Sequence, residues 1–140
     1  MAKKINSKKT HKPRSPRRTL ALIAHDGKKA EMVEFVKDNF DFLSHYHLLA
    51  TQTTGRLIQR TGLKVEKKLS GPQGGDAQIA AVVAEGKCDA VIFLRDPLGN
   101  HPHDPDISSL LRICDVHNVP LATNLSSAKL VVVGLVDRGF

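Results

Sequence analysis

The sequence predicts an α/β fold: a single-domain, Rossmann-like three-layer sandwich of about five mostly parallel strands with helices on both faces. Two observations predict it. From residue 19 onward, short apolar runs alternate with stretches of helical periodicity, which is the pattern of successive β-α units. In addition, hydroxyl, glycine and ionisable residues follow the apolar runs. Ligands bind beyond the carboxyl ends of the strands in such sheets, so we expect a site at that edge.

The expected strands are apolar runs of five to eight residues. The run "CDAVIFLRD" is the most continuous and should be a strand buried on both sides, whereas "LKVEKKLS" alternates and should lie nearer an edge. Right-handed crossovers between these strands would place helices on both faces of the sheet. The strands are expected within residues 19–26, 47–52, 63–70, 88–96 and 119–124.

The expected helices follow these runs in turn. In the first, Met32, Phe35, Val36 and Phe40 recur at helical spacing. Gly86 is a plausible C-terminal cap of a later helix, and an N-terminal cap region near Asp106 begins another. The helices are expected within residues 28–40, 53–62, 76–86 and 106–118, and residues 126–135 form a last helix or strand.

Length and composition limit the class of protein. The chain has 140 residues, enough for one domain with a real core. No apolar run approaches the ~18 residues of a membrane span, and no apolar segment follows the basic start as in a signal peptide. We therefore expect a cytoplasmic protein that does not associate with membranes. Cys88 and Cys114 lie far apart in apolar surroundings, which predicts buried free thiols rather than zinc ligands.

The net charge of +7 is concentrated at one end of the chain. Eight of the 21 basic residues lie in residues 1–18, which hold no acid, so residues 19–140 are nearly neutral. The segment 1–18 is polar and contains proline, which predicts a disordered basic tail before a domain spanning residues 19–140. Such a tail could bind nucleic acid or act as a weak targeting segment. A solvated extension is the simpler interpretation, and nucleic acid is not expected as the main partner.

Two glycine-containing loops at successive strand ends predict a phosphate site. In "ATQTTG", hydroxyl groups precede a helix whose free N–H groups and positive dipole end attract anions. In "LSGPQGGD", Ser70 supplies a hydroxyl and Gly71 lets the backbone approach a ligand. Lys29 could add a positive charge. Neither loop matches a nucleotide fingerprint, so a small phosphorylated metabolite is the expected ligand.

Ionisable side chains gather at the same edge and suggest acid–base chemistry or metal binding. Close carboxylates split their pKa values, and imidazoles carry protons near neutral pH. The simpler alternative is that Asp76 and Asp106 cap helices and that "DPL" and "PHDPD" form turns. The residues concerned are His25, Asp26, Asp76, Asp96, His101, His103, Asp104 and Asp106.

Five of these segments together resemble the methylglyoxal synthase family. Their order and spacing match the family along roughly residues 19–128. Any one of them would be a weak signal, but the combination is specific. The segments are "AHD" at 24–26, "ATQTTG" at 50–55, "LSGPQGGD" at 69–76, "FLRDPL" at 93–98 and "PHDPD" at 102–106.

The resemblance implies a reaction and an assembly. Dihydroxyacetone phosphate would be converted through an enediolate to methylglyoxal and inorganic phosphate, with no metal or organic cofactor. The enzyme would be a homohexamer inhibited by phosphate. An alternative with the same fold is a non-catalytic domain that senses a phosphorylated metabolite. A sensor would need only the two phosphate loops, so the presence of Asp76 and His103 favours the enzyme.

The resemblance also implies roles for individual residues. Asp76 would be the catalytic base and acid, and His103 would lie at the reacting carbonyl. Asp26, Asp96 and Asp106 match acidic positions of the same site. The family's threonine loop usually reads TGTTG, so Gln52 replaces a glycine, which matters if that position needs a positive φ. The residues expected to bind substrate are His25, Lys29, Thr51, Gln52, Thr53, Thr54, Ser70, Gly71 and His103.

Overall fold

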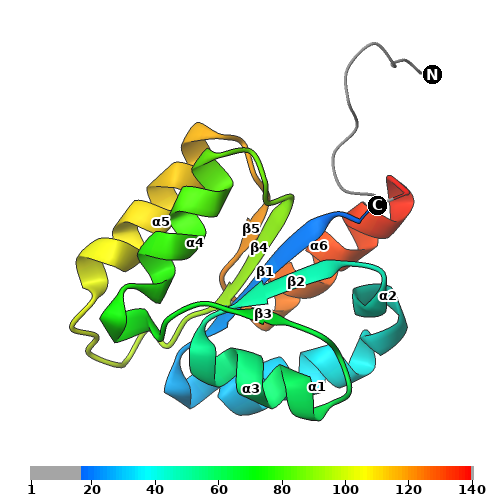
Figure 1. Cartoon of the computed structure of the whole chain (residues 1–140), viewed down its shortest axis with the longest axis horizontal. Helices are drawn as coiled ribbons and strands as arrows, with labels where there is room; N and C mark the ends of the chain where they lie inside the picture. The colour runs from blue at the N-terminus through cyan, green and yellow to red at the C-terminus, as the bar shows by residue number, and fades with distance from the viewer. Residues whose placement is uncertain (1–16, 140) are drawn as a thin grey trace.

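The computed structural model describes residues 17–139, and the predicted disorder of most of the 1–18 tail falls outside them. The described chain forms one five-stranded sheet with helices on both sides (Figure 1). The order of the strands is β3-β2-β1-β4-β5, and every pairing is parallel. The predicted α/β class is therefore confirmed, and the sheet is parallel throughout. The strands are β1 (Thr19–Ala24), β2 (His47–Ala50), β3 (Glu66–Lys67), β4 (Ala90–Leu94) and β5 (Leu121–Ala122).

The helices divide between the two faces of the sheet, as Figure 1 shows. One face is covered by α1 (Lys29–Asp38), α2 (Phe40–Ser44), α3 (Gln52–Arg60) and α6 (Leu125–Asp137), and the other by α4 (Gly75–Ala84) and α5 (Asp104–Val116). Two short 3-10 helices complete the secondary structure. The first, η2 (Asp26–Lys28), follows β1, and the second, η3 (Gly71–Gln73), precedes α4. Helices on both faces complete the three layers expected from the sequence.

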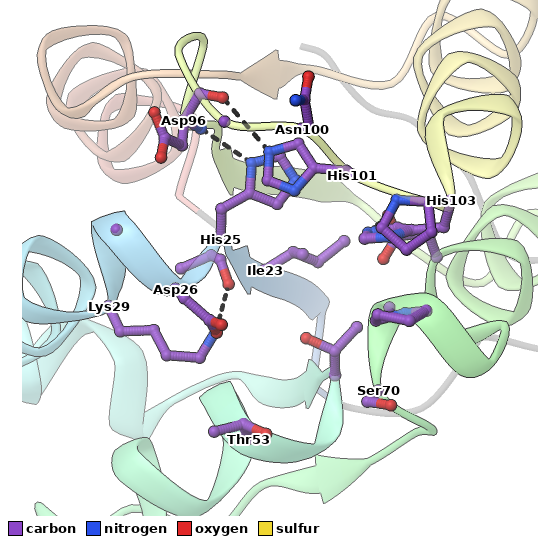
Figure 2. A pocket seen from close by; sticks show the side chains of 18 residues that line it. Ile23, His25, Asp26, Lys29, Thr53, Ser70, Asp96, Asn100, His101 and His103 are labelled. Atoms are coloured by element: carbon purple, nitrogen blue, oxygen red, sulfur yellow. Dashed lines mark hydrogen bonds and ion pairs between the residues drawn. The ribbon is translucent and has the colours of Figure 1, made fainter.

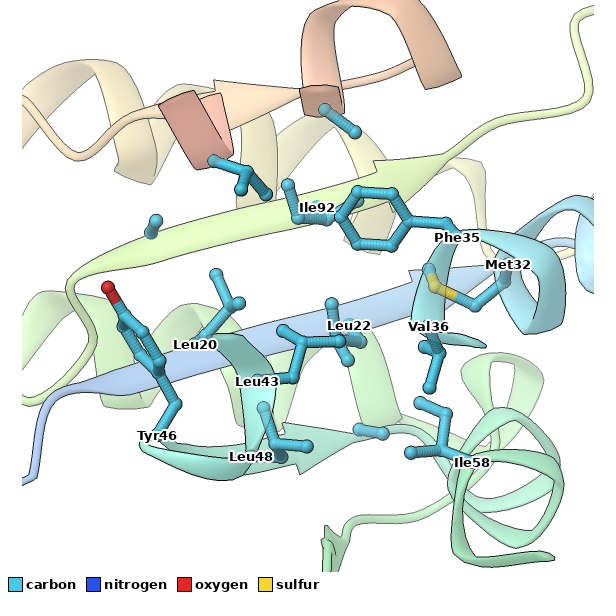
Figure 3. Packing of buried hydrophobic residues seen from close by; sticks show 14 of the residues in the cluster. Leu20, Leu22, Met32, Phe35, Val36, Leu43, Tyr46, Leu48, Ile58 and Ile92 are labelled. Atoms are coloured by element: carbon cyan, nitrogen blue, oxygen red, sulfur yellow. The ribbon is translucent and has the colours of Figure 1, made fainter. Parts of the chain in front are cut away.

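Successive side chains along each strand point to opposite faces of the sheet, and an apolar core forms on each face. Leu20 and Leu22 of β1 face α1 and its neighbours, whereas Ala21 and Ile23 face α4 and α5. Figure 3 shows the larger core, where Phe35 and other helix residues pack over β1 and β2. The strands β1 and β4 are buried along their whole lengths, as a parallel sheet covered on both sides requires.

Several boundaries differ from the sequence-based expectation, and β5, like β3, has only two residues. The third strand is only Glu66–Lys67, since it is an exposed edge strand paired on one side. The helix α5 begins at Asp104, two residues before the expected start, with Pro105 in its first turn where a missing N–H costs nothing. Residues 125–137 form a helix, which resolves the choice left open for that segment.

The connections around β1 position the site. The chain leaves β1 for β2 on one side of it, and β4 then pairs with β1 on the other side. The loops after β1 and β4 therefore separate and leave a crevice between them, the usual place for a ligand in an open parallel sheet. His25 follows β1 directly, and Asp96 follows β4.

Two further expectations can be compared with the fold. Cys88 and Cys114 are buried free thiols, as predicted, and burial raises their pKa values to about 12 and about 11. Within residues 17–139, none of the helices has both the length and the apolar character that crossing a membrane requires.

Candidate active site

A cavity of about 510 Å³ opens at the carboxyl edge of the sheet, beside the ends of β1 and β4 (Figure 2). Its wall combines the loops after β1, β2 and β4 with η3 and the start of α4. Segments that are far apart in the sequence therefore meet at the edge where the sequence predicted chemistry. The lining residues predicted from the sequence are His25, Asp26, Lys29, Thr51, Thr53, Ser70, Gly71, Asp76, Asp96 and His103.

Asp76 is the most buried carboxylate of the site. It lies in the first turn of α4, its side chain is 1% exposed, and neither carboxylate oxygen has a hydrogen-bond partner among the described residues. Burial raises its pKa, nearby His103 lowers it, and nearby Asp106 raises it. The capping alternative fails, because the carboxylate bonds to no N–H group of α4. A buried carboxylate without a hydrogen bond is costly, and such groups cluster at functional sites.

The glycines before Asp76 make its position attainable. Gly74 has φ +106°, a left-handed conformation that L residues rarely adopt. A Cβ atom at Gly75 would overlap the backbone carbonyl of Leu69, so the turn passes too close to its own chain for any side chain. This tight turn brings the start of α4 against the cavity and leaves Asp76 facing it.

His103 is the nearest titratable neighbour of Asp76. It occupies the N-cap position of α5, and its Nε2 atom lies 3.6 Å from Oδ2 of Asp76. Its Nδ1 atom is buried without a partner among the described residues. Gly71 lies directly against the ring, and a Cβ atom there would be 2.7 Å from Nε2. The imidazole thus has its place only because position 71 has no side chain.

His25 is held as a neutral imidazole. Its Nδ1 atom accepts a hydrogen bond of 2.8 Å from the backbone N–H of Asp96, and its Nε2 atom is buried without a partner among the described residues. Burial, followed by the charges of His101 and His103, lowers the pKa of His25 to about 4. At neutral pH the ring therefore offers an uncharged Nε2–H donor at the cavity wall.

Lys29 lines the cavity from the start of α1. Its Nζ atom donates to the carbonyl oxygen of Ala24 at 2.7 Å and pairs with Oδ1 of Asp26 at 3.0 Å. The hydrogen bond from Lys29 lowers the pKa of Asp26, whose side chain is fully exposed. The ammonium group is thus fixed at the end of β1 by two oxygens, and it keeps a third N–H for an anion.

The threonine loop lies where α3 begins. Thr51 is the N-cap residue, its side chain does not cap the helix, and it lines the cavity together with Thr53. The first N–H groups of α3 have no acceptor within the helix, so they are available to an anion. Gln52 is not among the residues with positive φ, so replacing a glycine here imposes no backbone strain. Thr54 instead reaches back toward the carbonyl of Ala24, 3.4 Å away.

Some predicted residues do not line the cavity, and some lining residues were not predicted. Gln52, Thr54 and Asp106 are the predicted residues that do not line it. Asp96 lines it, and its carboxylate accepts from the N–H of Leu98. The unpredicted lining residues are Ile23, Ala24, Gly27, Pro72, Gly99, Asn100 and Pro102. His101 lines the cavity too, as expected of the ionisable residues at this edge, but no sequence pattern indicates what it contacts.

The site also lacks the grouping of a metal centre. Within residues 17–139, no three histidine, cysteine, aspartate or glutamate side chains come close enough together to hold a metal ion. The gathered groups are instead a buried carboxylate, three imidazoles of which that of His103 lies beside the carboxylate, a fixed ammonium group and a helix N-terminus. This set suits proton transfer on a small anionic substrate.

The fold and the site define a parallel α/β domain with a buried carboxylate at a cavity beside the strand ends, and residues 31–123 match the family described as MGS-like domain. The methylglyoxal synthase of Borrelia garinii is 57% identical over 116 residues, covering 82% of this chain and 92% of the relative. That of Ralstonia nicotianae is 58% identical over 120 residues, covering 85% and 89%. The crystal structure of methylglyoxal synthase from Elizabethkingia anophelis superposes with a TM-score of 0.78 at 40% identity, covering 83% and 77%.

These relatives are similar over 77–92% of their lengths, which confirms the resemblance found in the sequence. The chain belongs to the methylglyoxal synthase family, and its activity is that of a lyase.

Proposed function

We propose that this lyase converts dihydroxyacetone phosphate to methylglyoxal and inorganic phosphate through an enediolate, with Asp76 as the base. The observation that carries the proposal is the buried Asp76 carboxylate, which has no hydrogen-bond partner among the described residues and faces a cavity next to His103. The names of the relatives support the product of the reaction. The sensor alternative gives no reason to keep such a carboxylate buried.

The phosphate group of the substrate binds at the end of the cavity opposite the His25 and His101 rings. Thr51 and Thr53 offer hydroxyls beside the free N–H groups of α3, and Ser70 adds a third hydroxyl. Lys29 contributes the fixed positive charge. A dianion at this point gains both the helix dipole and charge-assisted hydrogen bonds, so the phosphate determines how the three-carbon chain lies.

Proton abstraction is the first chemical step. The Asp76 carboxylate takes a proton from the hydroxymethyl carbon, and the electron pair of that C–H bond moves through the carbonyl carbon onto the carbonyl oxygen. His25 and His103 stabilise the developing negative charge with N–H donors. The raised pKa of Asp76 makes its carboxylate a stronger base than an exposed one.

Loss of phosphate is the second step. The hydroxyl proton of the former hydroxymethyl group moves to the neighbouring enediolate oxygen. The electron pair left on the hydroxymethyl oxygen forms an aldehyde C=O bond, and the enediolate C=C pair shifts to form a double bond to the phosphate-bearing carbon. The C–O bond to phosphate breaks with its electrons leaving on inorganic phosphate, which takes the proton held by Asp76. The resulting enol loses its hydroxyl proton, gains a proton at its terminal carbon and becomes methylglyoxal. The charge at Lys29 and the N–H groups of α3 stabilise the leaving dianion. No step requires a metal or an organic cofactor.

The remaining acidic and loop residues act more indirectly in this proposal. Asp106 lies close enough to Asp76 to raise its pKa. Asp26 orients Lys29, and the backbone of Asp96 orients His25. Thr54 and Gln52 shape the start of α3, where Gln52 contributes a backbone N–H to the phosphate.

Inorganic phosphate acts both as product and as inhibitor, because it fits the same loops as the phosphate of the substrate. We also propose a cytoplasmic homohexamer. Buried free thiols at Cys88 and Cys114 suit a reducing compartment. A row of exposed apolar residues on α6 suits contacts between copies: Leu130, Val133 and Val136. Analytical ultracentrifugation tests the assembly, and a monomer at micromolar concentration contradicts it.

One assay tests the reaction. Purified protein is mixed with dihydroxyacetone phosphate, and ¹H and ³¹P NMR follow methylglyoxal and inorganic phosphate with and without added phosphate. The proposal expects equal amounts of both products, far faster than spontaneous elimination, and slower turnover when phosphate is added. Phosphate binding without product formation would support the sensor instead.

A further inference from the structure

His101 lies in the loop between β4 and α5, and the proposed mechanism gives it no role. Its ring stacks on the ring of His25, with centroids 3.7 Å apart and an angle of 17° between the planes (Figure 2). The two residues are 76 positions apart in sequence, so the fold itself creates this contact. Face-to-face overlap at this distance leaves no room for water between the rings.

The rest of the His25 ring is already fixed by other groups. The backbone N–H of Asp96 donates to Nδ1, and Phe93 packs edge-on with centroids 5.0 Å apart. Because a backbone N–H can only donate, Nδ1 must keep its lone pair, and the proton of the neutral ring lies on Nε2. That Nε2–H is buried and has no partner among the described residues.

His101 is itself held in place. Its Nε2 atom lies 3.4 Å from the carbonyl oxygen of Asp96, which can only accept, so this nitrogen is the donor. A Cβ atom at Gly99 would be 3.1 Å from the same Nε2 atom, so the absence of a side chain at position 99 makes room for the ring. Both imidazoles are thus tied to one residue, Asp96, through its N–H and its C=O.

We propose that His101 is a positioning residue: its ring covers the face of His25 and holds that imidazole in the one orientation and tautomer that present Nε2–H to the substrate. The benefit to turnover rests on the proposed function, whereas the effect on the His25 ring does not. Without the His101 ring, the His25 ring can rotate about χ2, which has a broad energy minimum. Water can then reach Nδ1 of His25 and compete with the N–H of Asp96.

The charges around His25 act in the same direction. His101 and His103 come from the loop before α5 and its N-cap, and Arg95 comes from the end of β4. All three disfavour a second proton on His25, while Asp96 favours one, and His25 in turn favours the ionised form of Asp26. A stacked ring therefore reinforces the neutral state that the hydrogen bond from Asp96 requires.

Three variants test the proposal: His101→Ala removes the ring, His101→Phe keeps a flat ring without its charge or hydrogen bond, and Leu98→Ala alters an exposed position in the same loop. We expect His101→Ala to lower kcat/KM for dihydroxyacetone phosphate about tenfold. His101→Phe should stay within about threefold of the wild type because it retains the stack. Leu98→Ala should match the wild type.

The deciding measurement is long-range ¹H–¹⁵N NMR of the imidazoles. In the wild type and His101→Phe, His25 should give one protonated nitrogen, Nε2, and one bare nitrogen, Nδ1. In His101→Ala the two shifts should move toward an averaged value, with the folded state verified by circular dichroism. Unchanged His25 signals or unchanged kcat/KM in His101→Ala would overturn the proposal, as would His101→Phe behaving like His101→Ala. A wild type without lyase activity would refute the proposed function, and the spectra would still decide the positioning of His25.

Discussion

The Nε2 atom of His103 lies 3.6 Å from Oδ2 of Asp76, and the same nitrogen is the ring atom nearest to Gly71. The carboxylate is 1% exposed, and the imidazole is 8% exposed. This arrangement puts a base and a potential donor to the carbonyl oxygen within reach of one small substrate. This distance is longer than a normal hydrogen bond, so the hydrogen-bonding capacity of each group remains available to a substrate.

Asp76→Asn should stabilise the fold at neutral pH. Burial raises the pKa of Asp76 above its value in the unfolded chain, so its contribution to stability is fully present below the unfolded pKa and is lost as pH rises through the folded pKa. Removing the charge should therefore increase the free energy of unfolding by about 1 kcal/mol at pH 7. Urea unfolding at pH 7 and at about pH 4 measures this, and the gain should shrink at the lower pH.

The matched control for that stability measurement is Asp104→Asn, an exposed carboxylate in the first turn of α5. It should not raise stability, because no burial cost is relieved there. Loss of stability in Asp76→Asn at pH 7 would mean that the carboxylate has a structural partner after all.

Gly71→Ala should impair catalysis by moving His103. The added Cβ atom would lie 2.7 Å from Nε2 of His103, and a displacement on the order of 1 Å in a catalytic group costs about a hundredfold in rate. Steady-state kinetics should show kcat/KM lower by about that factor with the fold intact.

Gly134→Ala is the matched control, because it adds the same methyl group within α6 where, apart from its chain neighbours and the backbone of the helix, no described atom would lie within 4 Å. It should leave kinetics unchanged and raise stability by up to about 1 kcal/mol, since alanine favours helices over glycine. Equal kinetics in the two variants would show that a methyl group at position 71 fits without displacing His103.

Lys29→Gln should weaken the binding of phosphate-bearing ligands. The ammonium group is fixed between Ala24 and Asp26 at the cavity wall, and a charge-assisted hydrogen bond to phosphate contributes about 1.5–3 kcal/mol. We therefore expect the Kd for inorganic phosphate, measured by calorimetry, to rise about 10- to 100-fold.

Lys28→Gln removes the adjacent positive charge, which pairs with Glu31 outside the cavity. Its Kd for phosphate should stay within about twofold of the wild type, because exposed ion pairs contribute little. A similar loss of affinity in both variants would indicate general electrostatic attraction instead of a defined contact at Lys29.

The pH dependence of turnover should reflect Asp76 on the acid side. A base works only when deprotonated, so kcat/KM should fall as pH drops through the raised pKa of Asp76. His25 is already neutral at neutral pH, because its pKa is lowered to about 4, and we expect the fall to come from Asp76. The profile of His25→Gln should therefore be lower in amplitude but fall at the same pH, and a shifted acid limb would assign the titration to the imidazole.

The overall architecture was predictable because its signals are local. Short apolar runs followed by polar strand ends mark a parallel sheet, and the two glycine loops mark an anion site. The start of α5 was missed since "PHDPD" looks like a turn, although Pro105 is well suited to the first turn of a helix. The shortness of β3 depends on its edge position, which only the strand order reveals.

The candidate site was predictable in its residue types but not in its contacts. The burial of Asp76 and its lack of partners depend on how α4 and α5 pack, which no sequence pattern records. Thr51 and Thr53 line the cavity, whereas the hydroxyl of Thr54 points to the carbonyl oxygen of Ala24. Threonines of one motif can therefore point in different directions. The stacking of His101 on His25 arises from a loop conformation, which explains why sequence analysis gave His101 no role.

The most direct measurement is methylglyoxal formation from dihydroxyacetone phosphate by the wild type and Asp76→Asn, with phosphate binding measured in parallel. Loss of a general base lowers turnover by about 10²- to 10⁴-fold. We expect that loss in Asp76→Asn, with the Kd for phosphate nearly unchanged. A wild type no faster than spontaneous elimination, or an Asp76→Asn variant as fast as the wild type, would contradict it.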